Sequence, residues 1–317
     1  MEPVLAPRAS AILYNLLIGR ADHRPFLLPA NICPIVPITF LKAGAPFEFV
    51  DISPVSLHID LDSALERARR GGISGVLYAH TYGEPSTPFD FFSQLKRIDP
   101  SVLIMDDRCL CVPDLEADSA NPADVLLYST GYSKIVDLGF GGYAFLKDGL
   151  DYHSTSLPFV ASDLEVIEAA YKKSVAAREP FHYQDSDWLE TERPSPVWDE
   201  IRRQIGAALP RSLEGRREIN AIYAANLPVE IQLESVYQTW RFHIRVPDQK
   251  AMLERIFTEK CFASSHYASL AGILAEGSCP EAERLAAQVI NLFNDHHFTP
   301  ALAERVCHII LESLNAS

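Results

Sequence analysis

The sequence predicts an α/β fold with a mostly parallel sheet and helices on both faces, followed by a small α+β unit at the C-terminal end. Six short runs between residues 26 and 147 are rich in Val, Ile, Leu and aromatic residues and nearly free of polar ones. Strands buried on both faces of a parallel sheet have this composition. Helical patterns separate the runs, and such alternation is typical of βα units. The predicted strands cover residues 26–29, 47–52, 75–79, 102–105, 124–129 and 142–146.

Helical spacing of apolar residues in this first part predicts helices at residues 35–42, 61–70 and 88–97. Pro37 predicts a late or kinked start for the first of them, because proline has no backbone N–H to donate within a helix.

The pattern changes after Lys147. Residues 181–196 are polar and aromatic without a period, which predicts a loop or a partly ordered flap. Residues 199–225 predict a long helix, broken or bent near Pro210, that bridges two domains. We therefore predict a large domain at residues 1–195, an interdomain helix at 196–225 and a small domain at 226–317. Further helices are predicted at 164–177, 248–260 and 300–314, and a strand at 239–246.

Composition and charge argue against nucleic-acid-binding, membrane-spanning and secreted classes of protein. The 317 residues carry a formal net charge of -14, which argues against nucleic acid as the main partner. No apolar run approaches the roughly 20 residues needed to cross a bilayer, and the N-terminus lacks the pattern of a secretory signal. The six cysteines form no C-x-x-C pair, so we expect packed thiols, no metal site and a cytoplasmic protein.

Polar clusters follow three of the predicted strands. In open α/β sheets, ligands bind at the carboxyl ends of the strands. The clusters there are His80-Thr81-Tyr82-Gly83, the pair Asp106-Asp107, and the turn from Ser129 to Lys134.

Lys134 and one of the two acids carry the chemistry that these clusters suggest. The turn around Lys134 is rich in small residues, so its hydroxyls and amides could hold a phosphate while the lysine amine attacks an aldehyde carbon. A carboxylate of the acid pair could keep a pyridine nitrogen protonated. Since adjacent strand residues face opposite ways, only one acid can do this. A solvated surface turn and a helix cap are the competing interpretations.

The order of these motifs resembles the DegT–StrS sugar aminotransferase family, which has pyridoxal 5'-phosphate (PLP) as its cofactor and the aspartate-aminotransferase-like PLP fold type I. The likeness covers most of the chain, including Trp240-Arg241-Phe242 and His266-Tyr267 in the small domain. Its main segments are Leu27-Leu28-Pro29-Ala30-Asn31, Phe49-Val50-Asp51-Ile52, His80-Thr81-Tyr82-Gly83, Met105-Asp106-Asp107, Tyr128-Ser129 with Lys134, and Gly141-Gly142.

The resemblance implies specific roles and partners. It identifies Lys134 as the Schiff-base lysine, Asp107 as the acid on the pyridine nitrogen, and Ser129 with the helix start at Ala9 and Ser10 as the phosphate site. It also implies a homodimer and transamination of a keto sugar nucleotide, or a similar small carbonyl substrate, with glutamate as a candidate amino donor.

The sequence departs from the family at two cofactor positions. Cys33 stands where the family has an aromatic residue stacked on the cofactor ring. Leu110 stands where it commonly has Gln or His, three residues after the acid. The segment that helps to form the nucleotide-sugar pocket in the family is missing after Lys134.

Four further residues are weaker substrate candidates, each with a structural alternative. His80 contacts cofactor or substrate, or is a hydrogen-bonded structural residue. Tyr82 and Tyr132 line the pocket or only pack. Arg241 clamps a carboxylate or lies on a solvated strand face.

Two alternatives to transamination stay open. The same lysine and acid support other PLP reactions, such as decarboxylation, elimination or carbon–carbon bond chemistry. The chain could also be a binding protein that has kept the fold and lost catalysis.

Overall fold

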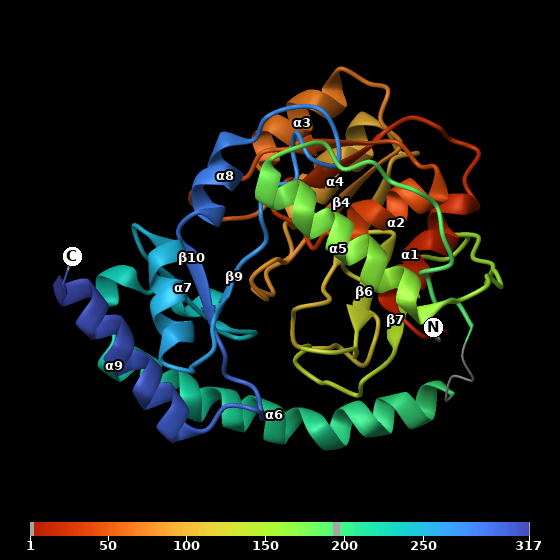
Figure 1. Cartoon of the computed structure of the whole chain (residues 1–317). Coiled ribbons are helices and arrows are strands. Elements are labelled where there is room, and N and C mark those ends of the chain that lie inside the picture. The colour runs from red at the N-terminus through yellow and green to blue at the C-terminus, as the bar shows by residue number, and fades with distance from the viewer. Residues whose placement is uncertain (1–2, 193–196, 317) are drawn as a thin grey trace.

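The computed structural model describes residues 3–192 and 197–316. A seven-stranded sheet forms the centre of the large part (Figure 1). Its strand order is β1-β7-β6-β5-β4-β2-β3, and the neighbours from β3 through β6 are parallel. β7 pairs antiparallel with both β6 and β1. The strands are β1 (Val4–Ala6), β2 (Phe26–Pro29), β3 (Phe47–Val50), β4 (Gly75–Ala79), β5 (Leu103–Asp107), β6 (Val125–Ser129) and β7 (Gly142–Leu146).

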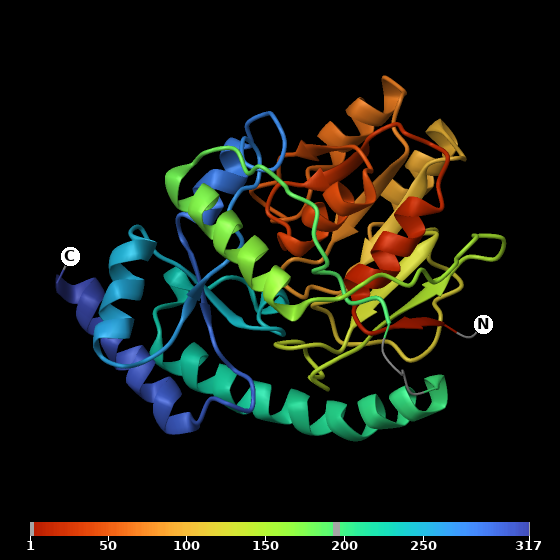
Figure 2. The same ribbon diagram turned by 45° about the vertical axis from the view of Figure 1, so that its right-hand side comes forward.

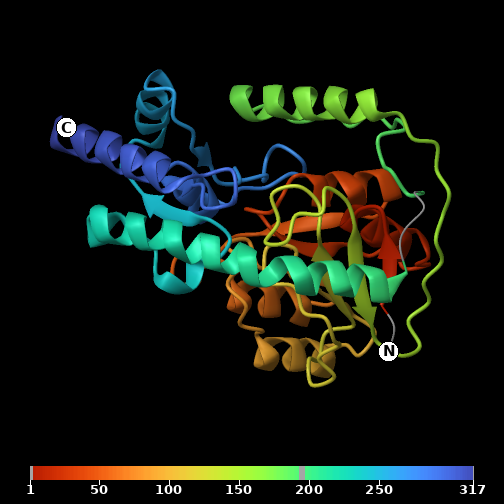
Figure 3. The same cartoon turned by 90° about the horizontal axis from the view of Figure 1, so that it is seen from below.

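Helices cover both faces of this sheet, as seen from below in Figure 3. Leu13, Phe40 and Ile167 represent the helices packed on one face, and Leu65, Phe92 and Ile205 those on the other. The first face is covered by α1 (Ala9–Ile18), α2 (Ile35–Ala43) and α5 (Ala161–Ala177), the second by α3 (Leu61–Arg69), α4 (Phe89–Ile98) and the start of α6 (Trp198–Asn226).

A second, smaller unit follows along α6, which extends below both parts (Figures 1 and 2). Its three-stranded sheet has the order β8-β10-β9, and its core includes Ile219 and Tyr223 from the second half of α6. It contains β8 (Phe242–Arg245), α7 (Gln249–Thr258), β9 (Ser264–Ser265), α8 (Pro280–Ala286), β10 (Val289–Leu292) and α9 (Pro300–Ala316), with 3-10 turns at Val229–Ile231 and Ser235–Tyr237.

The domain limits stay a prediction. The limit at 195/196 falls on residues 193–196, which lie outside the described residues. Residues 181–192 contain no helix or strand, as predicted for the loop. They are nevertheless packed, because Trp188 and Leu189 are buried in the core of the large part.

Three local predictions differ from the structure in whole or in part. α2 begins at Ile35 with Pro37 inside its first turn, where backbone N–H groups lack helical partners and proline is tolerated. The break considered near Pro210 is absent, because α6 is one helix from Trp198 to Asn226; the alternative of a bend is not contradicted, since this helix curves in Figures 1 and 2. β5 continues through Asp106 and Asp107, since both acids pair with β4 and β6.

Among the described residues, no helix combines the length and the apolar character that a bilayer crossing requires.

Two glycines provide a test of this packing. A Cβ added at Gly75 in β4 would lie 2.1 Å from a ring carbon of Phe26 and 2.7 Å from the carbonyl oxygen of Leu103. We expect Gly75→Ala to lower the free energy of unfolding by about 1–3 kcal/mol because of overpacking. Gly206, exposed on α6, meets no described atom within 4 Å. Gly206→Ala should stabilise the protein by up to about 1 kcal/mol through helix propensity. Urea unfolding of both variants measures the two effects, and equal effects would contradict the buried position of Gly75.

Candidate active site

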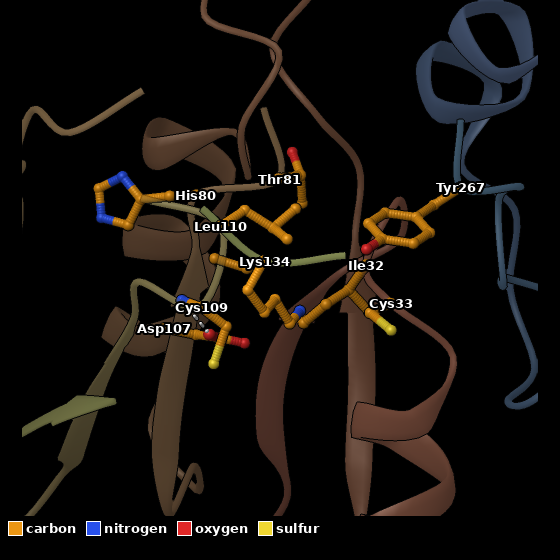
Figure 4. A pocket seen from close by; sticks show the side chains of 10 residues that line it. Ile32, Cys33, His80, Thr81, Asp107, Cys109, Leu110, Lys134 and Tyr267 are labelled. Carbon is orange, nitrogen blue, oxygen red and sulfur yellow. Dashed lines mark hydrogen bonds between the residues drawn. The ribbon is translucent and has the colours of Figure 1, made fainter. Parts of the chain in front are cut away.

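A pocket lies at the carboxyl ends of β4 and β5, beside the segment that follows β2 and the loop that follows β6 (Figure 4). It brings together Lys134 and Asp107, the amine and the carboxylate to which the sequence analysis assigned the central chemistry. Cys33 lies in the same pocket. The lining residues are Ile32, Cys33, Ala79, His80, Thr81, Asp107, Cys109, Leu110, Lys134 and Tyr267.

The last two residues of β5 face opposite sides of the sheet. Asp106 is fully buried, and its carboxylate accepts hydrogen bonds from His80 at 2.7 Å and from Asn121 at 3.1 Å. Arg108 forms an ion pair with it at 3.3 Å. Asp107 lines the pocket, where its Oδ1 accepts a hydrogen bond from the backbone N–H of Cys109 at 3.0 Å. Of the two acids, Asp107 therefore shares the pocket with Lys134.

The backbone around Lys134 is fixed by residues from distant parts of the chain. Ser133 adopts the left-handed conformation with φ 62°, and its N–H donates to Asp137 at 2.9 Å. The indole of Trp240 donates to the carbonyl of Ser133 at 2.6 Å, and Arg216 donates to the carbonyl of Lys134 at 3.0 Å. Figure 4 shows the lysine side chain extending into the pocket from this anchored backbone.

Arg216 and Trp240 are therefore important residues that the sequence analysis did not select for this role. Arg216 is 3% exposed and also donates to Asn294 at 2.6 Å. Burial and the nearby Arg241 lower the pKa of Arg216 to about 10, so it stays charged at neutral pH. A buried arginine inside a long helix is the signal that could have identified it, because such a charge needs partners.

The remaining walls of the pocket are mostly apolar or weakly polar. Burial raises the pKa of both Cys33 and Cys109, which keeps these thiols neutral. Leu110 is buried against Ile135 and Trp240, so it presents no polar group to a ligand. In the described part of the chain, no group of three His, Cys, Asp or Glu side chains could hold a metal ion.

The predicted phosphate residues lie together, beside rather than within the lining of this pocket. Ser129 pairs with Gly142 across β6 and β7. A Cβ on Gly142 would lie 2.3 Å from the backbone nitrogen of Ala9, the first residue of α1. The glycine thus lets the N-terminus of α1, with Ala9 and Ser10, approach Ser129. Arg8, which precedes this helix, makes no side-chain cap to it. Backbone N–H groups at such a helix start are suited to bind an anion.

His80 has the structural position that the sequence analysis kept as an alternative. Its two ring nitrogens contact the carbonyl of Glu84 and the carboxylate of Asp106. Figure 4 shows the ring pointing away from Lys134. His80 therefore anchors Asp106 on the far side of β5.

The other three weaker candidates are absent from the lining of this pocket, but Tyr132 lines a second cavity together with Lys134. Tyr82 is fully buried and stacks on His266, with ring centroids 4.3 Å apart. Tyr132 is 78% exposed. The solvated position considered for Arg241 is wrong: it is 1% exposed, forms an ion pair with Asp295 at 2.9 Å and lies over the ring of Phe293. Local alternation did not reveal this burial, because Arg241 precedes β8 and is covered by residues distant in sequence.

The pair of His80 and Asp106 should make stability depend on pH. Burial lowers the pKa of His80, but Cys111 and Asp106 outweigh burial and raise it to about 10. A pKa above its unfolded value of about 6.5 means that protonated His80 stabilises the fold fully below that pH, and that this contribution is lost as pH rises toward 10. We expect the difference in Tm between wild type and His80→Gln to be largest near pH 6 and to shrink up to pH 10. His153→Gln, at an exposed position, is the control. A difference that does not change with pH would contradict the charged pair.

Comparison with known proteins supports the architecture. No protein-family profile matches the sequence, and no curated protein matches it at a significant level. A sugar aminotransferase from Micromonospora echinospora has a similar structure, with 18% identity over 98% of this chain and 87% of the other and a TM-score of 0.70. A DegT DnrJ EryC1 StrS aminotransferase from Brucella abortus is 14% identical over 98% of this chain and 85% of the other, with a TM-score of 0.68. A protein from Streptococcus pneumoniae, described as a sugar aminotransferase in its PLP form, is 14% identical over 96% of this chain and 85% of the other. Its TM-score is 0.71. The predicted fold is confirmed: the chain has the aspartate-aminotransferase-like PLP fold type I, as found in these aminotransferases.

Proposed function

We propose that the protein is a PLP-dependent aminotransferase that acts on a keto sugar nucleotide or a similar small carbonyl substrate. The observation that carries this proposal is the placement of Lys134 and Asp107 in one pocket, at the carboxyl ends of the strands of this fold. The similarity to sugar aminotransferases, one of them in a PLP form, supports both the cofactor and the substrate class.

The residues in and beside the pocket fit PLP in their chemistry. The amine of Lys134 suits the aldehyde carbon, and the carboxylate of Asp107 suits a protonated pyridine nitrogen. The hydroxyl of Ser129 and the helix start at Ala9 and Ser10 suit the phosphate. Gly142 supports this fit, because any larger residue would push the helix start away from Ser129. When bound, PLP supplies an acceptor for the electrons of a substrate's α-carbon.

The protein's own residues then hold charge and move protons. The carboxylate of Asp107 would stabilise a positive charge on the pyridine nitrogen of a bound cofactor. The amine of Lys134 carries a proton between the two carbon atoms that exchange it in transamination. Its main chain cannot shift freely, because Arg216 and Trp240 hold the carbonyls of Lys134 and Ser133. This arrangement fixes the point from which the lysine side chain enters the pocket.

A homodimer is part of the proposal, and α5 is the feature that supports it. This helix of 17 residues has a single buried residue, Ile167, among its described members. Val166 beside it is 66% exposed. A helix with a single buried residue has most of its surface available for contact with a second copy. Glutamate is the proposed amino donor, on the strength of the family resemblance.

The first prediction concerns Lys134. With added PLP, the wild type should show an absorbance band in the near-visible that borohydride removes, since the amine reacts with the aldehyde. Lys134→Ala should lack this band. Lys172→Ala, which removes an exposed lysine of α5, should keep it. If the wild type shows no band at saturating PLP, the assignment as a PLP enzyme is withdrawn.

A second prediction separates the two acids. Asp107→Asn should lower the single-turnover rate with an amino donor by about 100-fold or more, because it removes a charge opposite the ring nitrogen. Asp106→Asn should mainly lower Tm, because it breaks a buried pair with His80 and Arg108. Stopped-flow absorbance and thermal melts measure the two effects. A larger loss of rate in folded Asp106→Asn would reverse the assignment.

The amino-donor reaction also tests the alternative chemistries. Formation of the keto acid from glutamate supports transamination. Release of carbon dioxide or of an unsaturated product from an amino acid would favour decarboxylation or elimination on the same residues.

A further inference from the structure

Tyr267 is the aromatic side chain that faces the pocket. Among the described residues that line it, His80 also has an aromatic ring, but that ring points away toward Asp106 (Figure 4). The side chains of Cys33, Cys109 and Leu110 are smaller or not planar. Figure 4 shows Tyr267 entering from the small unit, with Lys134 between it and Asp107.

The segment that carries Tyr267 is fixed against the large part of the molecule. It follows β9, and the preceding residue, His266, stacks on Tyr82 at 4.3 Å with an angle of 25° between the rings. Three residues later, the N–H of Leu270 donates to the carbonyl of Ala30 at 2.9 Å. Burial lowers the pKa of His266 to about 3, so the ring is neutral when it stacks. Tyr267 is thus held from both sides before any ligand binds.

The hydroxyl of Tyr267 stays protonated in this position. Burial raises its pKa well above the ordinary value, and the neighbouring Cys33 adds to the shift. The side chain therefore brings a planar ring and a neutral hydroxyl to the pocket. Aromatic rings favour offset or edge contacts with other rings, at about 0.5–1.5 kcal/mol beyond the area that they bury.

We propose that Tyr267 is the aromatic wall of the cofactor site and binds the pyridine ring of PLP from the side of the small unit. Cys33, which lies beside it in the pocket, is too small to provide this contact. The inference rests on the proposed function and adds a binding residue to it. It also makes Tyr82 and His266 positioning residues, because their stack holds the segment in place.

The test measures PLP affinity rather than activity. Apo protein is titrated with PLP, and absorbance gives the dissociation constant. Tyr267→Leu should weaken binding by about tenfold, which corresponds to the upper part of the range for an aromatic pair. Tyr267→Phe keeps the ring and should bind within about twofold of wild type. Tyr152→Leu is the matched control, a partly buried tyrosine outside the pocket whose hydroxyl accepts a hydrogen bond from Asn15.

A rescue variant adds an independent measurement. The double variant Tyr267→Leu, Cys33→Phe removes the ring at position 267 and adds a phenyl ring at position 33, on another wall of the same pocket. Its affinity for PLP should recover to within about threefold of wild type. Recovery also excludes a folding defect as the cause of the loss in Tyr267→Leu.

Each result has a defined meaning. Wild-type affinity in Tyr267→Leu overturns the inference and leaves the proposed function intact. An equal loss in Tyr267→Leu and Tyr267→Phe also overturns it, because the hydroxyl and not the ring would then be responsible. Failure of the wild type to bind PLP overturns the proposed function and this inference together.

Discussion

The opposed orientation of Asp106 and Asp107 at the end of β5 is the constraint on which the site depends. The pleat of a strand sends adjacent side chains to opposite faces. Asp106 is held on one face by His80, Asn121 and Arg108, so Asp107 must face the pocket. A buried charge without partners is costly, and the network around Asp106 therefore fixes the register of this strand end. Lys134 then needs only to reach the same pocket from the next strand.

The second requirement is a fixed backbone around Lys134, and the small unit provides it. Arg216 on α6 and Trp240 just before β8 donate to the carbonyls of Lys134 and Ser133. The long helix α6 makes this possible, because its first half packs on the large sheet and its second half belongs to the small core. The segment after β9 adds Tyr267 to the same pocket. The site is therefore assembled from both parts of the chain, and its geometry depends on how they pack.

Much of the fold could be predicted because its signals are local. The bounds of β2, β4 and β7 agree with the prediction from apolar runs, since a strand buried on both faces needs such a run. β1, β9 and β10 were missed: β1 and β9 have only three and two residues, and the apolar run of β10 is four residues long and interrupted by Asn291. Pro210 predicted a break that α6 does not have. In that case, packing on both cores outweighs the loss of one helical hydrogen bond.

For the candidate site too, some features followed from the sequence and others only from the tertiary structure. The sequence by itself determined that Lys134, Asp106 and Asp107 follow or end adjacent strands, and that one acid of the pair would face a ligand. Residue type and the alternation along a strand are enough for that conclusion. Only the tertiary structure decided that His80 points away, that Arg241 is buried against Asp295, and that Tyr267 enters the pocket with Arg216 holding the loop behind it. These contacts join residues far apart in the chain, and their geometry depends on the packing of one unit against the other, which no local pattern encodes.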